Sequence, residues 1–426
     1  MTPGRRAAAA RWAGAAVLLA WAFLGLLWAQ VILLPHPLLP PASVADLLGD
    51  VPTSTRPERF VVMIFKETSL LLAAFSLFGL LLSALLYRGG ARKISPVAAG
   101  LCAVAVAASL VPAAQAWKVA SAEGVALSLP GYFTGPAFAG EHAPETVTYA
   151  RPGGEKLEAD VWRPPEKGAT TAARDSGERP AVIVVHGGGW RSGERGDFPL
   201  WNAWFASQGF VVFDIDYRLS PPPTWREAPA DVGCAVGWVK ENAARYGVDP
   251  QQVVLMGRSA GAHLALSSAY THDSVPEPGC DARYPHDTGV AAVVAFYPPT
   301  DLARLSSQGY LGGMDRFVGG TPKTVPGRYR HMSPVSHVDP RDPPTFLAHG
   351  GDDQIVPAEQ SELLAKRLRA AGVPHRLVEL PWANHTFDFR WGGWGSQIAR
   401  STLRDFLEHH LKTPKKTRED PPGQDG

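Results

Sequence analysis

One serine of the chain lies in a pentapeptide whose composition suits it to act as a nucleophile. Residues 257–261 read GRSAG, directly after the apolar run 253–256 and before a helical stretch. Glycines on both sides allow the sharp turn in which a strand passes into a helix. Such a turn places Ser259 at a helix N-terminus, where N–H groups favour negative charge. We therefore predict that Ser259 is a covalent nucleophile rather than part of an ordinary tight turn.

A glycine cluster earlier in the chain suits the stabilisation of an oxyanion. Residues 186–190 read HGGGW and follow the apolar run 181–185. Preorganised N–H groups stabilise the oxyanion of acyl transfer by about 3–4 kcal/mol each, and glycine lets the backbone approach a substrate. We predict that the N–H groups of Gly188, Gly189 and Ala260 form an oxyanion hole. A phosphate-binding loop would need a Walker lysine or a GxGxxG helix start, and the cluster has neither.

A serine nucleophile needs a general base, and a carboxylate must orient that base. His385 follows the apolar run 375–380 and is the candidate base. Asp352 and Asp353 both follow the apolar run 345–348, so both are candidates for the orienting acid. The chain order of serine, acid and histidine, with each residue after a strand, predicts a Ser-His-Asp triad.

Three further histidines lie close to these motifs in the sequence. We expect His349, just before the two acids, to support their loop. His263 lies one helical turn beyond Ser259 and is expected to pack or to form hydrogen bonds. His186 is expected to shape the glycine-rich loop rather than to act as a base.

The elements that must position these residues follow from hydrophobic periodicity. After a predicted hairpin at 146–161, short apolar runs alternate with amphipathic stretches. The predicted strands are 181–185, 210–215, 253–256, 290–296, 345–348 and 375–380, and the predicted helices include 230–246, 261–270 and 358–371. This alternation predicts an α/β fold with a mostly parallel central sheet and helices on both faces. Residues 301–337 have no clear period and are expected to cover the mouth of the site.

The N-terminal part of the chain contains three long apolar runs, at 13–34, 69–87 and 96–116. Each is long enough to cross a bilayer as a helix, which takes about 20 residues. The first run exceeds the usual apolar core of a signal peptide, which is its alternative interpretation. A buried soluble helix is the alternative for the third. Lys66 and Glu67, beside the second run, are expected to be interfacial charges.

The runs divide the chain into four parts. We predict a membrane region at 1–117, a linker at 118–144, a catalytic domain at 145–412 and a disordered tail at 413–426. Basic residues lie before the first run and between the second and third: Arg5, Arg6, Arg11, Arg88, Arg92 and Lys93. The positive-inside rule makes both groups cytoplasmic, so three spans place the catalytic domain outside the cytoplasm in a multi-pass membrane protein.

Composition excludes several classes of function. The 426 residues carry a formal net charge of +1, which argues against nucleic acid as a partner. Three cysteines are too few for a disulfide scaffold or a cysteine-rich zinc site. A bridge between Cys234 and Cys280 is one interpretation for an exported domain, and two free thiols are the favoured one.

Taken together, HGGGW, DYRL at 216–219, GRSAG, HGGDDQIVP at 349–357 and NHTF at 384–387 resemble the α/β-hydrolase esterases and lipases. The resemblance covers about residues 145–411. It is closest to small carboxylesterases and feruloyl or acetyl-xylan esterases, near the hormone-sensitive-lipase-like branch. It implies a triad of Ser259, Asp353 and His385, because the IVP after Asp353 resembles the usual setting of the acid.

The resemblance also implies hydrolysis of carboxylic esters without a metal or an organic cofactor. Arg258 departs from the acidic or small residue that often precedes the nucleophile, which leaves acyl or alcohol preference open. Asp301 matches a family position and is expected to be structural. The N-terminal spans are not part of the family pattern.

We therefore expect a membrane-anchored serine esterase. Its substrate would be a small-molecule ester or a lipid or glycan ester. An acyltransferase or a peptidase using the same triad is the alternative within enzymes. A catalytically silent hydrolase fold that serves as a binding module is the alternative of another class.

Overall fold

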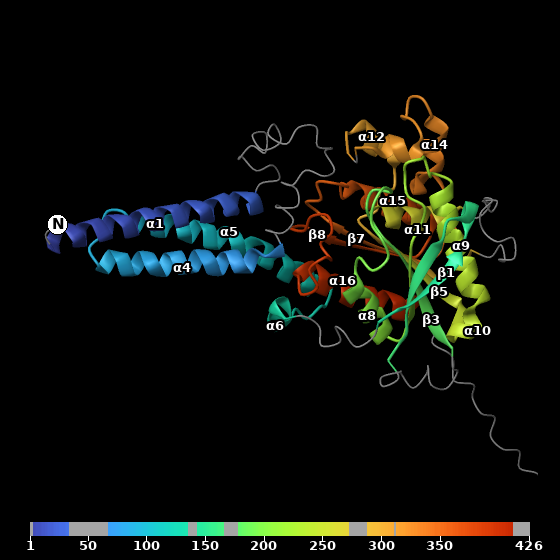
Figure 1. Cartoon of the computed structure of the whole chain (residues 1–426), viewed down its shortest axis with the longest axis horizontal. Coiled ribbons are helices and arrows are strands. Elements are labelled where there is room, and N and C mark those ends of the chain that lie inside the picture. The colour runs from blue at the N-terminus through green and yellow to red at the C-terminus, as the bar shows by residue number, and fades with distance from the viewer. Residues whose placement is uncertain are drawn as a thin grey trace, which may run out of the picture.

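The computed structural model describes residues 3–33, 67–134, 143–165, 178–271, 288–310 and 312–411. Three long helices form a bundle that extends from one side of an α/β unit (Figure 1). They are α1 (Pro3–Leu33), α4 (Ser69–Arg88) and α5 (Ser95–Ala122). Residues 413–426, for which disorder was predicted, lie outside the described part of the chain.

The α/β unit is built on an eight-stranded sheet of order β1-β2-β4-β3-β5-β6-β7-β8. The strands are β1 (Glu145–Ala150), β2 (Leu157–Trp162), β3 (Arg179–Val185), β4 (Val211–Ile215), β5 (Val248–Arg258), β6 (Ala292–Phe296), β7 (Thr345–Gly350) and β8 (His375–Leu380). Only β2 pairs antiparallel with its neighbours, β1 and β4; the other pairs are parallel. This sheet confirms the predicted α/β fold class.

Strand register brings the predicted motifs to one edge of the sheet. Val185, at the end of β3, pairs with Gly257 near the end of β5. The glycine-rich loop and the serine pentapeptide therefore emerge side by side. Gly350 at the end of β7 pairs with Leu380 at the end of β8, which places the acid loop beside the histidine loop. Carboxyl ends of neighbouring parallel strands are the usual location of a site in this kind of sheet.

Helices cover both faces of the sheet, because the strands are apolar on both sides. The first face packs against α9 (Glu227–Glu241), α10 (Ala243–Tyr246), α11 (Ala260–Tyr270) and α15 (Glu359–Ala371). The second packs against α8 (Pro199–Ser207), α16 (Trp394–His410) and the end of α5. Alternate residues of β3 illustrate the layering: Ile183 joins the first core and Val184 the second.

The segment between β6 and β7 forms short helices above this edge of the sheet (Figure 1). They are α12 (Leu302–Ser307), α13 (Met314–Val318), α14 (Pro326–His331) and the 3-10 turn η3 (Pro334–Ser336). Phe317 of α13 stacks on Trp190 of the glycine-rich loop, with ring centroids 4.7 Å apart. The segment expected to cover the site therefore packs against one of its loops.

Small residues fill the interior of the N-terminal bundle, and large apolar residues lie on its outside. Ala98, Cys102 and Ala105 of α5 are buried, whereas Phe23 and Leu81 are exposed. Such an arrangement is typical of helices that pack in lipid, where apolar side chains need not be hidden from water. All three helices are long and apolar enough to span a membrane.

The third apolar run continues further than its sequence pattern indicates. Helix α5 ends at Ala122 rather than at 116, and the short helix α6 (Leu129–Phe133) lies in the stretch predicted as linker. Ala116 and Ala120 of α5 belong to the core on the second face of the sheet. Contact with the α/β unit thus supports the added helical turns.

The expectation of free thiols is wrong for one of the cysteines. Cys234 in α9 is disulfide-bonded, whereas Cys102 in α5 is a buried free thiol. Cys280 lies outside the described residues. Chain periodicity carries no information on the distance between two thiols, which is why the sequence left this choice open.

Candidate active site

Ser259 occupies a strained turn between β5 and α11. Its φ of 52° and ψ of −119° are rare for a residue with a side chain. Glycines on both sides make the turn sterically feasible. A Cβ at Gly257 would overlap the backbone of Gly261, and a Cβ at Gly261 would overlap the carbonyl oxygen of Val185. The turn therefore raises the serine hydroxyl above the strand end while the chain packs closely beneath it.

The structure brings the predicted serine, histidine and acid together. His385 Nε2 lies 2.9 Å from Ser259 Oγ, and His385 Nδ1 lies 2.6 Å from Asp353 Oδ2. All three residues are buried. The backbone N–H of His385 donates to Asn384 Oδ1 at 2.7 Å, which holds the start of this loop. A serine joined to an imidazole and a carboxylate in this way can lose its proton to the imidazole as it attacks.

Asp353, not Asp352, is the acid that contacts the histidine. Asp353 Oδ1 accepts hydrogen bonds from the N–H groups of Ile355 and Val356 at 2.8 and 2.9 Å, which fixes the carboxylate. Burial raises the pKa of Asp353, but His385 and His349 lower it more strongly, so the pKa lies well below its usual range. The Asp353 carboxylate therefore remains ionised.

The glycine-rich loop runs against the serine turn. A Cβ at Gly187 would lie 3.2 Å from Arg258 O and 3.6 Å from Ser259 Cβ. Gly188 and Gly189 have positive φ angles of 109° and 62°, and a Cβ at Gly188 would overlap Ser192 O. Ala260 is the first residue of α11, so its N–H has no partner within that helix. Gly188 and Gly189 thus lie on a loop whose first glycine contacts the serine turn, and Ala260 begins the helix that follows that turn.

The other histidines have structural hydrogen bonds. His263 Nδ1 accepts from Trp190 Nε1 at 3.2 Å, and its Nε2 donates to Met332 O at 2.6 Å. Burial lowers the pKa of His263 to about 4, so this ring is neutral. His349 Nδ1 lies 2.6 Å from Ser361 Oγ and its Nε2 lies 2.9 Å from Val356 O.

His186 stacks on Tyr217 with ring centroids 4.3 Å apart, and its Nδ1 lies 2.8 Å from Gly187 O. Burial lowers the pKa of His186. Asp301 caps α12 by accepting a hydrogen bond from the N–H of Arg304 at 3.0 Å. These placements agree with the structural roles expected for both residues.

A buried ion pair lies directly beside the nucleophile, and sequence reasoning did not find its acid. Arg258 Nε donates to Asp388 Oδ2 at 2.5 Å, and Tyr297 Oη donates to Asp388 Oδ1 at 2.6 Å. Burial and the nearby Asp388 charge raise the pKa of Tyr297 well above its usual value, so the phenol stays protonated. The Tyr297 ring packs 4.4 Å from the His385 ring. Arg258 itself was the signal for this acid in the sequence, because an arginine in a buried turn requires an acidic partner.

Arg258 also lies over aromatic rings on the side of the sheet away from the glycine-rich loop. Its guanidinium carbon is 4.2 Å from the centroid of Phe198 and 5.3 Å from that of Trp201. The departure from the family pattern at this position is therefore accommodated by a cation–π and ion-pair environment within the protein.

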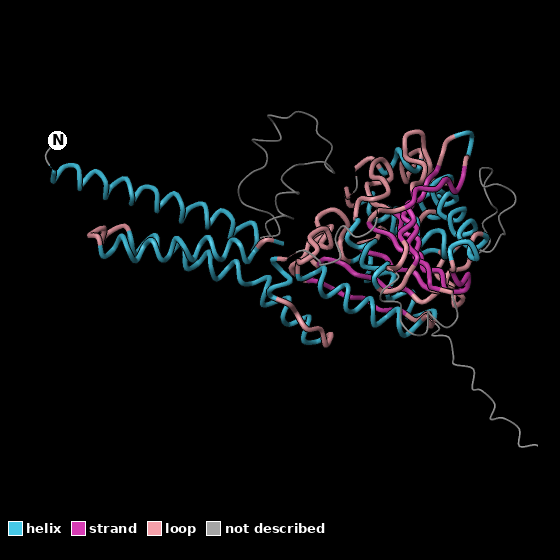
Figure 2. The backbone as a smooth tube through the Cα atoms, turned by 60° about the horizontal axis from the view of Figure 1, so that its bottom comes forward, coloured by secondary structure: helices cyan, strands magenta, loops and turns pink. Residues whose placement is uncertain are grey.

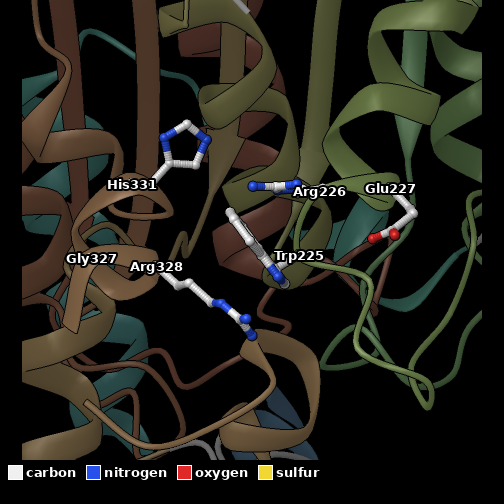
Figure 3. Close-up of a pocket in the computed structure, with 6 residues that line it drawn as sticks. All are labelled: Trp225, Arg226, Glu227, Gly327, Arg328 and His331. Carbon is white, nitrogen blue, oxygen red and sulfur yellow. The ribbon is translucent and has the colours of Figure 1, made fainter. Parts of the chain in front are cut away.

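A separate surface hollow lies between the start of α9 and α14 (Figure 3). Its lining residues are Trp225, Arg226, Glu227, Gly327, Arg328 and His331. The Arg328 guanidinium lies 5.3 Å from the Trp225 ring and donates to Val318 O at 3.2 Å, so it already has protein partners. No residue predicted for the site lines this hollow. Among the described residues, no group of three or more His, Cys, Asp or Glu side chains is arranged to hold a metal ion.

The chain is similar in sequence to several known proteins. A family model described as BD-FAE matches residues 170–368. The chain is 34% identical over 263 residues to esterase LipQ of Mycobacterium tuberculosis, covering 60% of this chain and 60% of LipQ. It is 32% identical over 374 residues to the probable carboxylic ester hydrolase LipM of the same organism, covering 85% of this chain and 82% of LipM.

Among solved structures, esterase Est2 of Thermogutta terrifontis with propionate bound is similar to the α/β unit. The TM-score is 0.52 at 27% identity, covering 66% of this chain and 98% of the esterase. The alignment with LipM is too long to be confined to the α/β unit, so it includes part of the N-terminal region.

Proposed function

The chain belongs to the α/β-hydrolase esterases, a family of carboxylic ester hydrolases, and we propose that it cleaves its ester through Ser259, His385 and Asp353. The observation that carries this proposal is the continuous hydrogen-bond chain from Ser259 Oγ through His385 to Asp353. It lies at the carboxyl ends of parallel strands, where this fold places its reactive groups.

In the proposed first step, Ser259 Oγ attacks the ester carbonyl carbon while His385 Nε2 takes the hydroxyl proton. The negative charge on the carbonyl oxygen is stabilised by the N–H groups of Gly188, Gly189 and Ala260. Ionised Asp353 stabilises the imidazolium that forms and keeps its Nδ1–H in place. His385 then gives its proton to the departing alkoxide, which leaves as the alcohol, and Ser259 remains acylated.

In the second step, His385 takes a proton from a water molecule that attacks the acyl-enzyme. The same N–H groups stabilise the second oxyanion. The acid is released when Ser259 Oγ leaves and regains a proton from His385. Ester and water are thereby converted to acid and alcohol, and the enzyme returns to its starting state.

We also propose a multi-pass membrane location with the α/β unit outside the cytoplasm. The α4–α5 turn carries Arg88, Arg92 and Lys93 and lies at the end of the bundle remote from the α/β unit (Figure 1). Basic residues of short loops are enriched on the cytoplasmic side. The disulfide at Cys234 supports the same orientation, because disulfides persist in oxidising compartments.

The test uses the full chain purified in detergent and p-nitrophenyl esters from acetate to palmitate. Ser259→Ala and His385→Ala should each lower turnover by at least about 10³-fold. His409→Ala, which changes an exposed histidine of α16, should leave turnover unchanged. Ser259→Ala should also abolish labelling by a fluorophosphonate probe.

The alternatives give different results in this test. A wild-type chain that reacts with the probe but hydrolyses none of the esters would indicate an acyltransferase or an enzyme with a narrow substrate range. A folded chain that neither labels nor hydrolyses would indicate a catalytically silent binding module.

A further inference from the structure

Exposed apolar surface in the α/β half of the molecule is concentrated in one place. Among the described residues, the large apolar side chains that are exposed lie in α1, α4 and α5, with three exceptions. These are Leu129, Phe133 and Phe389, which are 55%, 56% and 74% exposed. We call these three residues the junction patch. Exposed large apolar side chains that gather in one patch mark a protein–protein or membrane interaction site.

The two segments that carry the junction patch are joined to each other. Arg390, the residue after Phe389, donates to the carbonyl oxygen of Tyr132 at 2.5 Å. Its guanidinium also lies 3.9 Å from the centre of the Tyr132 ring. Tyr132, next to Phe133, packs against Trp394 at 4.5 Å. Helix α6 and the loop between β8 and α16 therefore form one surface.

This surface is attached to the end of the membrane bundle. Tyr132 Oη and Arg390 Nη1 both donate to the carbonyl oxygen of Glu67, each at 2.7 Å. Glu67 lies two residues before α4 begins. Gln397 of α16 holds the other side of α6, because its amide oxygen accepts from the Ser128 N–H at 2.8 Å. The α6–α16 junction lies beside the bundle in Figures 1 and 2.

Helix lengths place this junction at the level of the bilayer surface. The 28 residues of α5 span about 42 Å, and the hydrocarbon core of a bilayer is about 30 Å thick. The charged turn that precedes α5 (Arg88, Arg92 and Lys93) belongs at the opposite surface, so the last turns of α5 project beyond the hydrocarbon. Trp117, which is exposed, lies where this boundary falls, and tryptophan is enriched there. Beyond it, Glu123 forms an ion pair with Arg376 of β8 at 2.5 Å.

The loop between β8 and α16, which carries Phe389, also carries the proposed catalytic base. His385 precedes Phe389 by four residues, and the Phe389 ring makes an edge contact with Phe198 at 6.3 Å. Phe198 in turn lies under the Arg258 guanidinium, beside the nucleophile. The loop that completes the triad is thus held between the active site and the membrane bundle.

We propose that the junction patch rests in the surface of the lipid bilayer, so that the triad acts on amphiphilic esters held in that bilayer. The proposal about the substrate rests on the proposed esterase function, whereas the position of the patch does not. Lipid is the partner that this patch fits, because the patch continues the lipid-facing surface of the bundle.

The first experiment measures the position of the patch in liposomes containing the full chain. An environment-sensitive fluorophore is attached to Phe389→Cys in a Cys102→Ala background, with the Cys102→Ala parent as the labelling control. Spin-labelled lipids should quench this fluorophore. The same fluorophore on Lys323→Cys, an exposed residue between α13 and α14, should not be quenched. Equal, weak quenching at both positions would overturn the proposal.

The second experiment measures the substrate. Turnover of a long-chain ester incorporated in the liposomes is compared with that of soluble p-nitrophenyl acetate. Leu129→Ser and Phe133→Ser should each lower the lipid-ester rate by about tenfold, because a polar side chain loses the apolar contact with the bilayer. Both should change the soluble rate by less than about twofold. Leu81→Ala, in the middle of α4, should alter neither rate.

The outcomes separate the two proposals. Equal losses on both esters, or no loss on the lipid ester, would overturn the substrate inference. A wild-type chain that shows neither turnover nor labelling by the fluorophosphonate probe would instead contradict the esterase function. The quenching result would still decide where the patch lies.

Discussion

At the scale of single residues, the carboxylate of Asp353 contacts two histidines. Asp353 Oδ2 lies 2.6 Å from His385 Nδ1 and 3.3 Å from His349 Nε2. Only His385 reaches Ser259, because His349 is held by Ser361. We infer that His349 helps to keep Asp353 ionised and in place, while His385 moves the proton.

Replacement of the two neighbouring acids tests this assignment. Asp353→Asn should lower the turnover number by about 10³–10⁴-fold, because the amide favours the wrong tautomer of His385. Asp352→Asn is the matched control and should stay within about tenfold of wild type. Turnover of a soluble ester in detergent measures both. A larger loss from Asp352→Asn would assign the acid to Asp352.

The low pKa of Asp353 sets the pH dependence at the same scale. Since this carboxylate stays ionised as the pH falls, its protonation should not contribute to the loss of activity on the acid side. The acid limb of kcat/KM should therefore depend on one protonation only, because a protonated general base cannot accept the Ser259 proton. An acid limb that depends on two protonations would show that Asp353 is protonated in the same pH range as the general base.

The buried pair of Arg258 and Asp388 predicts a strong stability effect. Asp388→Asn leaves Arg258 charged and unpaired, which typically costs about 3–5 kcal/mol. The midpoint of thermal unfolding, followed by near-ultraviolet circular dichroism, should fall markedly. In the double variant Arg258→Met/Asp388→Asn the buried charge is gone, so the midpoint should recover. A double variant less stable than Asp388→Asn would contradict the pairing.

At the scale of elements, the site depends on how closely β5, α11 and the end of β3 approach one another. Gly261 at the start of α11 lies against the carbonyl oxygens of Val185 and His186. Backbone atoms cannot move aside as a flexible side chain can. The glycine is therefore required by the close contact between elements, even though its own φ is ordinary.

Substitution of two helical glycines separates this contact from helix propensity. Gly261→Ala should destabilise the α/β unit by about 1–3 kcal/mol or more and lower soluble-ester turnover, because the elbow and the glycine-rich loop must separate. Gly327→Ala in α14 has no atom within 4 Å of the added methyl group and should be neutral or slightly stabilising. Thermal unfolding and turnover measure both. A Gly261→Ala chain as stable and active as wild type would refute the close packing.

At the scale of the whole molecule, two kinds of packing meet within one chain. The bundle hides small side chains and exposes large apolar ones, whereas the sheet of the α/β unit buries its Val, Ile and Phe on both faces. The first suits lipid and the second suits water. The two parts are joined by apolar packing of Ala116 and Ala120 of α5 and by polar contacts, in which Arg390 donates to the carbonyl oxygen of Glu67 and Arg376 pairs with Glu123.

The redox state of the cysteines tests the orientation of the whole molecule. In protein purified from a bacterial membrane, Cys234 should react with a thiol reagent only after reduction, because it is disulfide-bonded. Cys102 should react after unfolding without reduction. Mass spectrometry of labelled peptides locates each modification. Labelling of Cys234 without reduction would contradict an oxidising compartment for the α/β unit.

Local patterns in the sequence determined the elements and the candidate site residues. Strands, helices and the GRSAG and HGGGW turns depend on neighbours a few residues apart, so periodicity and glycine placement were sufficient. The three apolar helices follow from length and composition alone. The sequence also identified Ser259 and His385 as candidate site residues, because each follows a predicted strand.

Only the tertiary structure decided which distant groups meet. It places Asp353 rather than Asp352 against His385, and it pairs Arg258 with Asp388, which is 130 residues away. It also joins Arg390 to Glu67 across 323 residues and puts Cys234 in a disulfide, against expectation. Such contacts depend on the summed geometry of several loops and on strand register. No local preference of a residue encodes that geometry, because each partner is satisfied only when the whole sheet and its helices have assembled.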